Sequence, residues 1–210
     1  TSNVPRYVSV KNGFATLADS VFIGDDVPQS PFTIKAIKAS TGKWQKCLYP
    51  YDKAGKPLSE SDVFAHQDVK TYLQANKEAL LKGKTTFPGW YLFGRSQALA
   101  DVWQPKLAVN TLVRNAGDFK LNDVAAGEGI YSGLYIIANY DVSFDLIRRI
   151  VASDTLVEYV KTLRKYKSGG YYTFNSKDLE QFINYQISIT DGKECRVKQR
   201  VSYGYPDLFQ

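Results

Sequence analysis

The sequence predicts an α+β fold in which mixed or antiparallel sheets pack against a few helices. Apolar and polar residues alternate in several short segments, which is typical of half-buried strands. Two longer segments place apolar residues three and four positions apart, which indicates amphipathic helices. The chain has 210 residues, of which 44% are hydrophobic and 23% charged, so it can bury a sizeable core. Because no repeat or low-complexity linker interrupts it, we expect a single domain spanning residues 1–210.

Strands are expected in the first 39 residues. The opening segment alternates around Asn12-Gly13, a dipeptide typical of tight turns. Thr33–Lys38 alternate as a further strand. The apolar faces of the opening segment are supplied by Phe14, Leu17, Val21 and Phe22.

Helical spacing appears twice in the middle of the chain. The first helix begins at Ser59-Glu60-Ser61-Asp62, which has the composition of an N-terminal cap, and ends near Lys82-Gly83, in one or two parts. The second occupies Ser143–Lys165 and is interrupted at Ser153-Asp154.

Between these helices, Trp90-Tyr91-Leu92-Phe93 is an apolar run of strand-forming residues that predicts a buried or half-buried strand. Gly94 ends it, and Arg95-Ser96-Gln97 follow on the connection. Lys106 then begins another strand, whose alternating residues are Leu107, Val109, Thr111 and Val113. A polar triplet between apolar strands suits recognition of a polar surface, and an ordinary solvated connection fits the same spacing.

The last third of the chain adds four expected elements. Ile130–Ile137 form a buried strand, and the glycines of Lys167-Ser168-Gly169-Gly170 make a sharp turn into an aromatic strand. Asn175, with Asp178 three residues on, caps a short helix over Lys177–Phe182. Ile183–Ile189 are expected to form one more strand.

Catalytic motifs are missing from the sequence, which has no P-loop, GxSxG, HExxH or EF-hand pattern. Cys47, Cys195 and His66 are too few for a structural zinc site. We therefore expect no catalytic, cofactor-binding or metal-binding residue in this chain. The few cysteines fit a cytoplasmic protein, and no apolar run is long enough to span a membrane. Asp118-Phe119-Lys120 matches part of a metal-dependent nuclease pattern, so a nuclease module is an alternative.

The charge favours a polyanionic partner, because 27 Lys and Arg residues face 21 Asp and Glu residues, a net charge of +6. Lysines neutralise DNA phosphates, whereas Arg and Gln reach base edges in the grooves. Arg95-Ser96-Gln97 offer such groups, and Lys167-Ser168-Gly169-Gly170 combine a cation, a hydroxyl and backbone amides that suit phosphate. A protein-interaction domain that binds no nucleic acid is also consistent with this modest charge.

Three blocks occur in a recognisable order. They are NGFATLADSVFI (Asn12 to Ile23), WYLFGRSQAL (Trp90 to Leu99) followed by PKLAVNTL (Pro105 to Leu112), and YKSGGYYTFNSKDLEQF (Tyr166 to Phe182). Together they resemble the C-terminal specificity, or target-recognition, domain of TaqI-like and Eco57I-like N6-adenine DNA methyltransferases of restriction–modification systems.

The resemblance implies a domain that holds double-stranded DNA against a separate methyltransferase domain. That catalytic domain binds S-adenosylmethionine and flips the target adenine out of the duplex. The family's catalytic tetrapeptide, Asn or Asp, Pro, Pro, then Tyr or Phe, does not occur here. We therefore expect this chain to be a C-terminal piece of a larger enzyme that binds no cofactor by itself. A restriction nuclease is a further candidate partner.

Carried over residue by residue, the resemblance gives a set of DNA-binding candidates. We expect Arg95 and Gln97 to contact bases or adjacent phosphates, and Lys106 and Lys167 to contact phosphate. The alternative for Arg95 is a structural ion pair within the domain. The whole candidate set is Thr16, Arg95, Ser96, Gln97, Lys106, Lys167, Ser168, Gly169, Gly170 and Tyr171.

Overall fold

The computed structural model of the chain describes residues 4–82 and 89–190 and confirms the α+β class. A four-stranded antiparallel sheet has the order β1-β8-β4-β6, and two three-stranded sheets have the orders β3-β2-β7 and β5-β10-β9. The strands are β1 (Val8–Asn12), β2 (Thr33–Lys38), β3 (Lys43–Leu48), β4 (Lys106–Val109), β5 (Leu112–Val113), β6 (Leu121–Val124), β7 (Gly129–Tyr131), β8 (Leu134–Ala138), β9 (Tyr166–Lys167) and β10 (Tyr171–Thr173).

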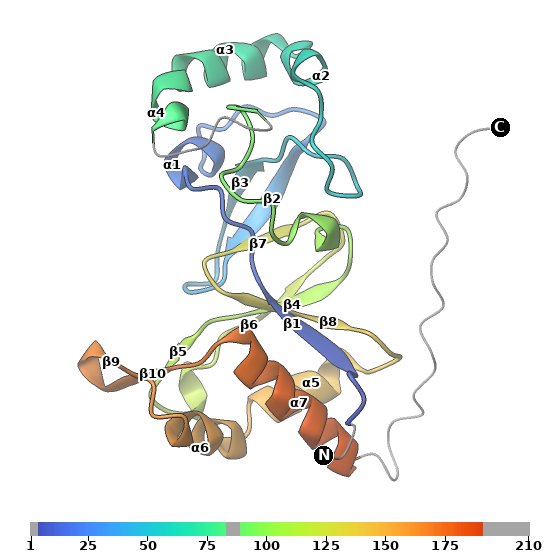
Figure 1. Cartoon of the computed structure of the whole chain (residues 1–210), viewed down its shortest axis with the longest axis vertical. Helices are drawn as coiled ribbons and strands as arrows, with labels where there is room; N and C mark the ends of the chain where they lie inside the picture. The colour runs from blue at the N-terminus through green and yellow to red at the C-terminus, as the bar shows by residue number, and fades with distance from the viewer. Residues whose placement is uncertain (1–3, 83–88, 191–210) are drawn as a thin grey trace, which may run out of the picture.

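Helices cover the two ends of the molecule (Figure 1). One end holds α1 (Asp19–Phe22), α2 (Glu60–Phe64), α3 (Gln67–Ala75) and α4 (Lys77–Leu81), next to β2 and β3. The other end holds α5 (Phe144–Val151), α6 (Asp154–Thr162) and α7 (Ser176–Thr190). Short 3-10 turns lie at η1 (Leu99–Asp101), η2 (Ala116–Asp118) and η3 (Ser168–Gly170). Within the described ranges, no helix has the length and apolarity that crossing a membrane requires.

The four-stranded sheet is buried on both faces, because successive side chains of a strand point to opposite sides. Val10, Leu107 and Ile136 pack with the apolar residues of α5, α6 and α7. On the opposite face, Ala108 and Tyr135 pack against Ile37 of β2. The small cluster between the sheets therefore joins the cores of the two ends.

Residues 91–93 are buried and Trp90 is half-buried, as predicted, but the predicted strand is wrong. Phe93 packs among aromatic rings, with centroid separations of 5.1 Å from Phe14 and 4.9 Å from Phe22. Its backbone N–H donates to the hydroxyl of Tyr51 at 2.8 Å and not to a neighbouring strand. An aromatic cluster rather than a sheet ladder thus stabilises this segment.

Two predicted strands are each divided between sheets. Residues 106–113 form β4 and β5, which belong to different sheets. Residues 130–137 form β7 and β8, because the chain reverses at Ser132, whose φ of 54° is left-handed. Asn12-Gly13 is not a hairpin turn either: β1 ends at Asn12, and Phe14 forms a parallel bridge with Tyr131.

The helix caps are confirmed. The Ser59 side chain accepts the N–H of Asp62 at 3.1 Å. Asn175 and Asp178 each accept the backbone N–H of the other at 2.9 Å. The break at residues 153–154 separates α5 from α6, and the first helical segment forms three helices. The strand predicted for residues 183–189 is wrong, because α7 continues through them and places its β-branched residues at helical spacing in the core.

Candidate nucleic-acid interface

Five of the predicted DNA-binding residues lie on the hairpin β9–η3–β10, at one edge of the molecule in Figure 1. Lys167, Ser168, Gly169 and Gly170 are exposed, and Tyr171 is half-buried. Both glycines have φ of 76°, a left-handed conformation that only glycine adopts without strain. The paired glycines therefore allow the chain to reverse within three residues while its backbone amides and Lys167 stay accessible.

Arg114 stands beside this hairpin. Val113 pairs with Tyr172 in the antiparallel β5–β10 ladder, and continuing the register places Arg114 opposite Tyr171. The central guanidinium carbon lies 4.5 Å from the centroid of the Tyr171 ring. Tyr171 therefore supplies an aromatic platform for the cation of Arg114.

Asp118 fixes the backbone that carries Arg114. Its Oδ2 accepts the backbone N–H of Arg114 at 2.7 Å and that of Asn115 at 3.3 Å. The N–H of Arg114 is the main cause that lowers the pKa of Asp118, and the N–H of Asn115 and the cations of Arg114 and Lys120 lower it further. The same oxygen lies 3.8 Å from Nε of Arg114. Asn115 and Asp118 form a capping box around η2, which fixes the position of Arg114. The spacing of these two residues is the sequence signal for it.

A hollow of about 460 Å³ adjoins this arrangement and is lined by Tyr171, Asp118, Lys120 and Asn110 among others. Asn110 is engaged internally, because its amide donates to the carbonyl oxygens of Leu112 at 3.1 Å and Asp118 at 2.8 Å. Its own Oδ1 accepts the N–H of Lys120 at 2.8 Å. We refer to Arg114, Lys120 and residues 167–171 as the Arg114 surface.

Arg95, Ser96 and Gln97 form a second exposed group. The N–H of Arg95 donates to the carbonyl of Ala15 at 3.2 Å, and Gln97 Nε2 donates to the carbonyl of Gly13 at 2.6 Å. The structure thus brings the block containing Thr16 against the block containing Arg95. Gln97 anchors the loop, whereas the guanidinium of Arg95 makes no ion pair with any described residue.

The structure places two predicted DNA contacts in the interior, and both assignments require correction. Thr16 is 1% exposed, and its hydroxyl donates to Asp19 and accepts the N–H of Ala18. Lys106 is 3% exposed. Neither side chain is placed to reach a phosphate.

The ammonium of Lys106 holds three chain segments together. It donates to the carbonyl oxygens of Val102 at 2.8 Å, Gln104 at 3.0 Å and Glu128 at 2.7 Å. Burial lowers its pKa to about 8, against the opposing influence of Asp101 and Glu128. Lys106 begins strand β4, but its side chain lies on the face of β4 that points between the sheets. This buried position decides its role.

The nuclease alternative depended on Asp118 and Lys120. Asp118 serves as a cap and partner for Arg114, and the parts of the chain that the structure describes bring no three His, Cys, Asp or Glu residues together as a metal site.

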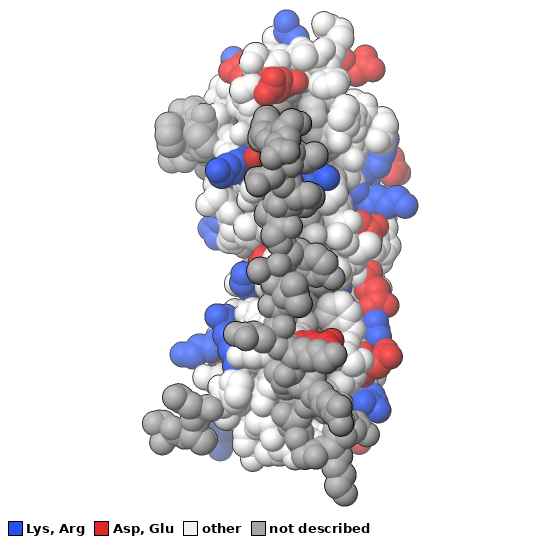
Figure 2. Space-filling model, turned by 90° about the vertical axis from the view of Figure 1, so that its right-hand side faces the viewer, with Lys and Arg blue, Asp and Glu red and all other residues white. Residues whose placement is uncertain are grey.

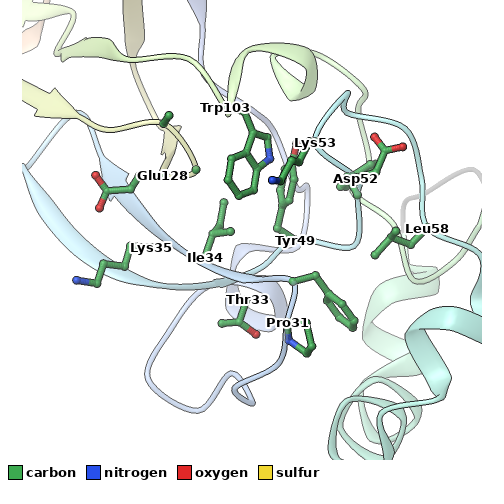
Figure 3. Close-up of a pocket in the computed structure, with 14 residues that line it drawn as sticks. Pro31, Thr33, Ile34, Lys35, Tyr49, Asp52, Lys53, Leu58, Trp103 and Glu128 are labelled. Atoms are coloured by element: carbon green, nitrogen blue, oxygen red, sulfur yellow. The ribbon is translucent and has the colours of Figure 1, made fainter. Parts of the chain in front are cut away.

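Figure 3 shows a different hollow, of about 740 Å³, whose lining is mostly apolar. Ile34 of β2 and Tyr49 line it together with the indole of Trp103, and the Lys53 ammonium lies 5.0 Å from the centre of that indole ring. Asp52 and Glu128 also contribute to its lining. The hollow shares no lining residue with the one beside the Arg114 surface.

Charge alone does not locate a DNA-binding face. Figure 2 shows one face of the molecule, on which basic and acidic side chains are interspersed over the surface that the grey residues leave visible. The Arg95 group follows Phe93 of the core that includes α2 and α3, whereas Arg114 follows Val113 of the core that includes α5, α6 and α7.

Comparison with known proteins gives a similarity among solved structures. No protein-family model and no curated protein matches the sequence. Among solved structures, the chain is similar to the type IIL restriction-modification enzyme MmeI, determined in complex with DNA. The TM-score is 0.57 at 13% identity, over 82% of this chain and 24% of the MmeI chain. The similarity shows a shared fold, and this chain spans about a quarter of the length of MmeI.

Proposed function

We propose that this chain recognises double-stranded DNA as the specificity domain of a restriction–modification enzyme. The observation that carries the proposal is the Arg114 surface, where a cation stacked on an aromatic ring stands beside an exposed hairpin with a lysine and accessible backbone amides. The shared fold with MmeI, which was determined bound to DNA, supports this assignment.

Phosphate contacts in this proposal come from the hairpin. Lys167 is exposed and extended from a two-residue strand, and the glycine turn leaves room for a phosphate to approach the backbone. Lys120 adds a second cation, whose ammonium makes a long 3.5 Å contact with the carbonyl of Ser40. Arg95 and Ser96 would contact the duplex at a separate position.

The finer assignment rests on the sequence resemblance. We propose that this chain is the C-terminal recognition domain of a larger parent enzyme. The parent enzyme methylates adenine at N6 in the cytoplasm, and its separate methyltransferase domain holds S-adenosylmethionine. A methylation assay of the parent enzyme on a specific duplex tests this assignment. The unaltered enzyme should modify adenine, and Arg95→Ala should lose that modification. Intact methylation by that variant would contradict the role of Arg95.

Duplex binding should weaken steeply with salt, because neutralising phosphates releases counterions. We expect Lys167→Gln to reduce the slope of log affinity against log salt by about 1, since one phosphate contact is lost. Both effects are measured by the fluorescence anisotropy of a labelled duplex in a salt series from about 50 to about 200 mM.

The matched control is Lys70→Gln, because Lys70 lies on α3, far from the hairpin in Figure 1. Its salt slope should equal that of the unaltered protein. Equal slopes for Lys167→Gln and the unaltered protein would show that Lys167 touches no phosphate, and absence of duplex binding even at low salt would reject the proposed function itself.

A further inference from the structure

We infer that Arg114 reads a guanine in the major groove, an inference that rests on the proposed duplex binding and assigns a base to one side chain. Guanine presents two acceptors, N7 and O6, side by side, and a guanidinium presents two parallel N–H groups that match them. Such a contact requires a guanidinium that is exposed, oriented and free at its terminal edge. Arg114 meets each requirement.

The terminal edge of Arg114 is available. Its ion pair with Asp118 runs through Nε, at 3.8 Å, and not through the two terminal nitrogens. Among the described residues, these nitrogens have no hydrogen-bond partner, and the side chain is 52% exposed. The carboxylate therefore occupies the side of the fork that a base would not use.

Arg114 is restrained at two points, its guanidinium plane and its backbone. Tyr171 covers one face at 4.5 Å, and its own position is set by pairing of β10 with both β5 and β9. Asp118 restrains the backbone of Arg114 through the 2.7 Å hydrogen bond to its N–H. Less conformational entropy is lost on binding when a long side chain is already oriented.

The neighbouring carboxylate also favours a base over a phosphate. Asp118 is an acceptor-only anion close to Arg114 and would repel a phosphate drawn to the same place. A guanine edge carries no net charge and does not meet that repulsion. In contrast, Lys167 has no acidic ion-pair partner among the described residues, which suits a phosphate contact.

Selection of bound sequences from a pool of randomised duplexes tests this inference. The unaltered chain should enrich a motif that contains an invariant guanine. Arg114→Ala should retain the motif, lose the preference at that one position, and bind the selected duplex roughly 5- to 150-fold more weakly. Arg114→Gln should shift that position towards adenine, since Gln matches the N6 and N7 groups of adenine.

Two further variants separate base reading from other causes. Lys167→Gln should weaken binding with every position of the motif unchanged. Tyr171→Phe keeps the aromatic platform and should keep the guanine preference. If the unaltered chain enriches a motif and Arg114→Ala and Arg114→Gln keep every preference, the inference is overturned while the proposed function stands. If the unaltered chain enriches nothing, both fall together.

Discussion

Lys106→Met should lower the free energy of unfolding by about 2–4 kcal/mol, because carbonyl oxygens in the interior lose their donor. The ammonium of Lys106 serves three of them, from Val102, Gln104 and Glu128, at 2.7 to 3.0 Å. Methionine fills a similar volume, so the loss reports the hydrogen bonds more than a cavity. Urea denaturation of both proteins at the same pH measures the difference.

Lys120→Met is the matched control, since among the described residues the ammonium of Lys120 makes one hydrogen bond, the long 3.5 Å contact with the carbonyl oxygen of Ser40. It should change stability by less than about 0.5 kcal/mol, as exposed substitutions usually do. A similarly small effect for Lys106→Met would show that the three carbonyls do not depend on the lysine.

The lowered pKa of Lys106 also predicts how this difference varies with pH. The folded pKa is about 8, whereas an unfolded lysine titrates near its ordinary value of about 10.4. Between these values the unfolded chain binds more protons, so the contribution of Lys106 to stability rises with pH. The stability gap between the unaltered protein and Lys106→Met should be larger at about pH 9.5, which lies between the folded and unfolded pKa values, than at about pH 7.5, which lies below both. A gap that shrinks would mean that the carbonyls raise the pKa instead.

Gly13→Ala should destabilise the protein by roughly 3 kcal/mol, the upper end of the usual cost of overpacking. A Cβ at Gly13 would lie 2.5 Å from the carbonyl oxygen of Ile130 and 3.0 Å from Cα of Tyr131. Both neighbours are backbone atoms, and the same segment forms the hydrogen bonds from Gly13 N–H to Gly133 and from Phe14 N–H to Ile130, each at 2.9 Å. Relief of the clash must therefore separate the chain segments that connect the two sheets.

Thermal and urea unfolding of Gly13→Ala measure this cost. Gly117→Ala provides the comparison, because its Cβ would meet only the Asn115 side chain, at 3.3 Å, and its backbone is not left-handed. Gly117→Ala should cost much less than Gly13→Ala. Equal stability of the two variants would contradict the close approach at Gly13.

Local signals in the sequence predicted much of the fold. Thr33–Lys38 alternates and forms β2, and the Ser59 and Asn175 caps begin helices because their partners lie only three residues away. Residues 90–93 show the limit: their composition predicted burial, whereas the absence of a strand depends on rings such as Tyr51, distant in the sequence. For α7, the residue types favoured a strand, but packing at helical spacing prevailed.

The candidate site divides in the same way. The glycine pair predicted the exposed turn of the hairpin from its own sequence. Arg114 was not among the predicted residues, because its significance depends on Tyr171, which reaches it only through the β5–β10 pairing. Lys106 was misassigned for the opposite reason, since the carbonyls that bury it come from loops outside its own strand.

Competition between two unlabelled duplexes tests duplex recognition most directly. One carries the selected motif, and the other has the same length and composition in scrambled order. With the intact 210-residue chain bound to a labelled selected duplex, we predict displacement by the selected competitor at a concentration at least about 100-fold below that of the scrambled one. Equal displacement by the two competitors would contradict sequence-specific recognition of DNA by this chain.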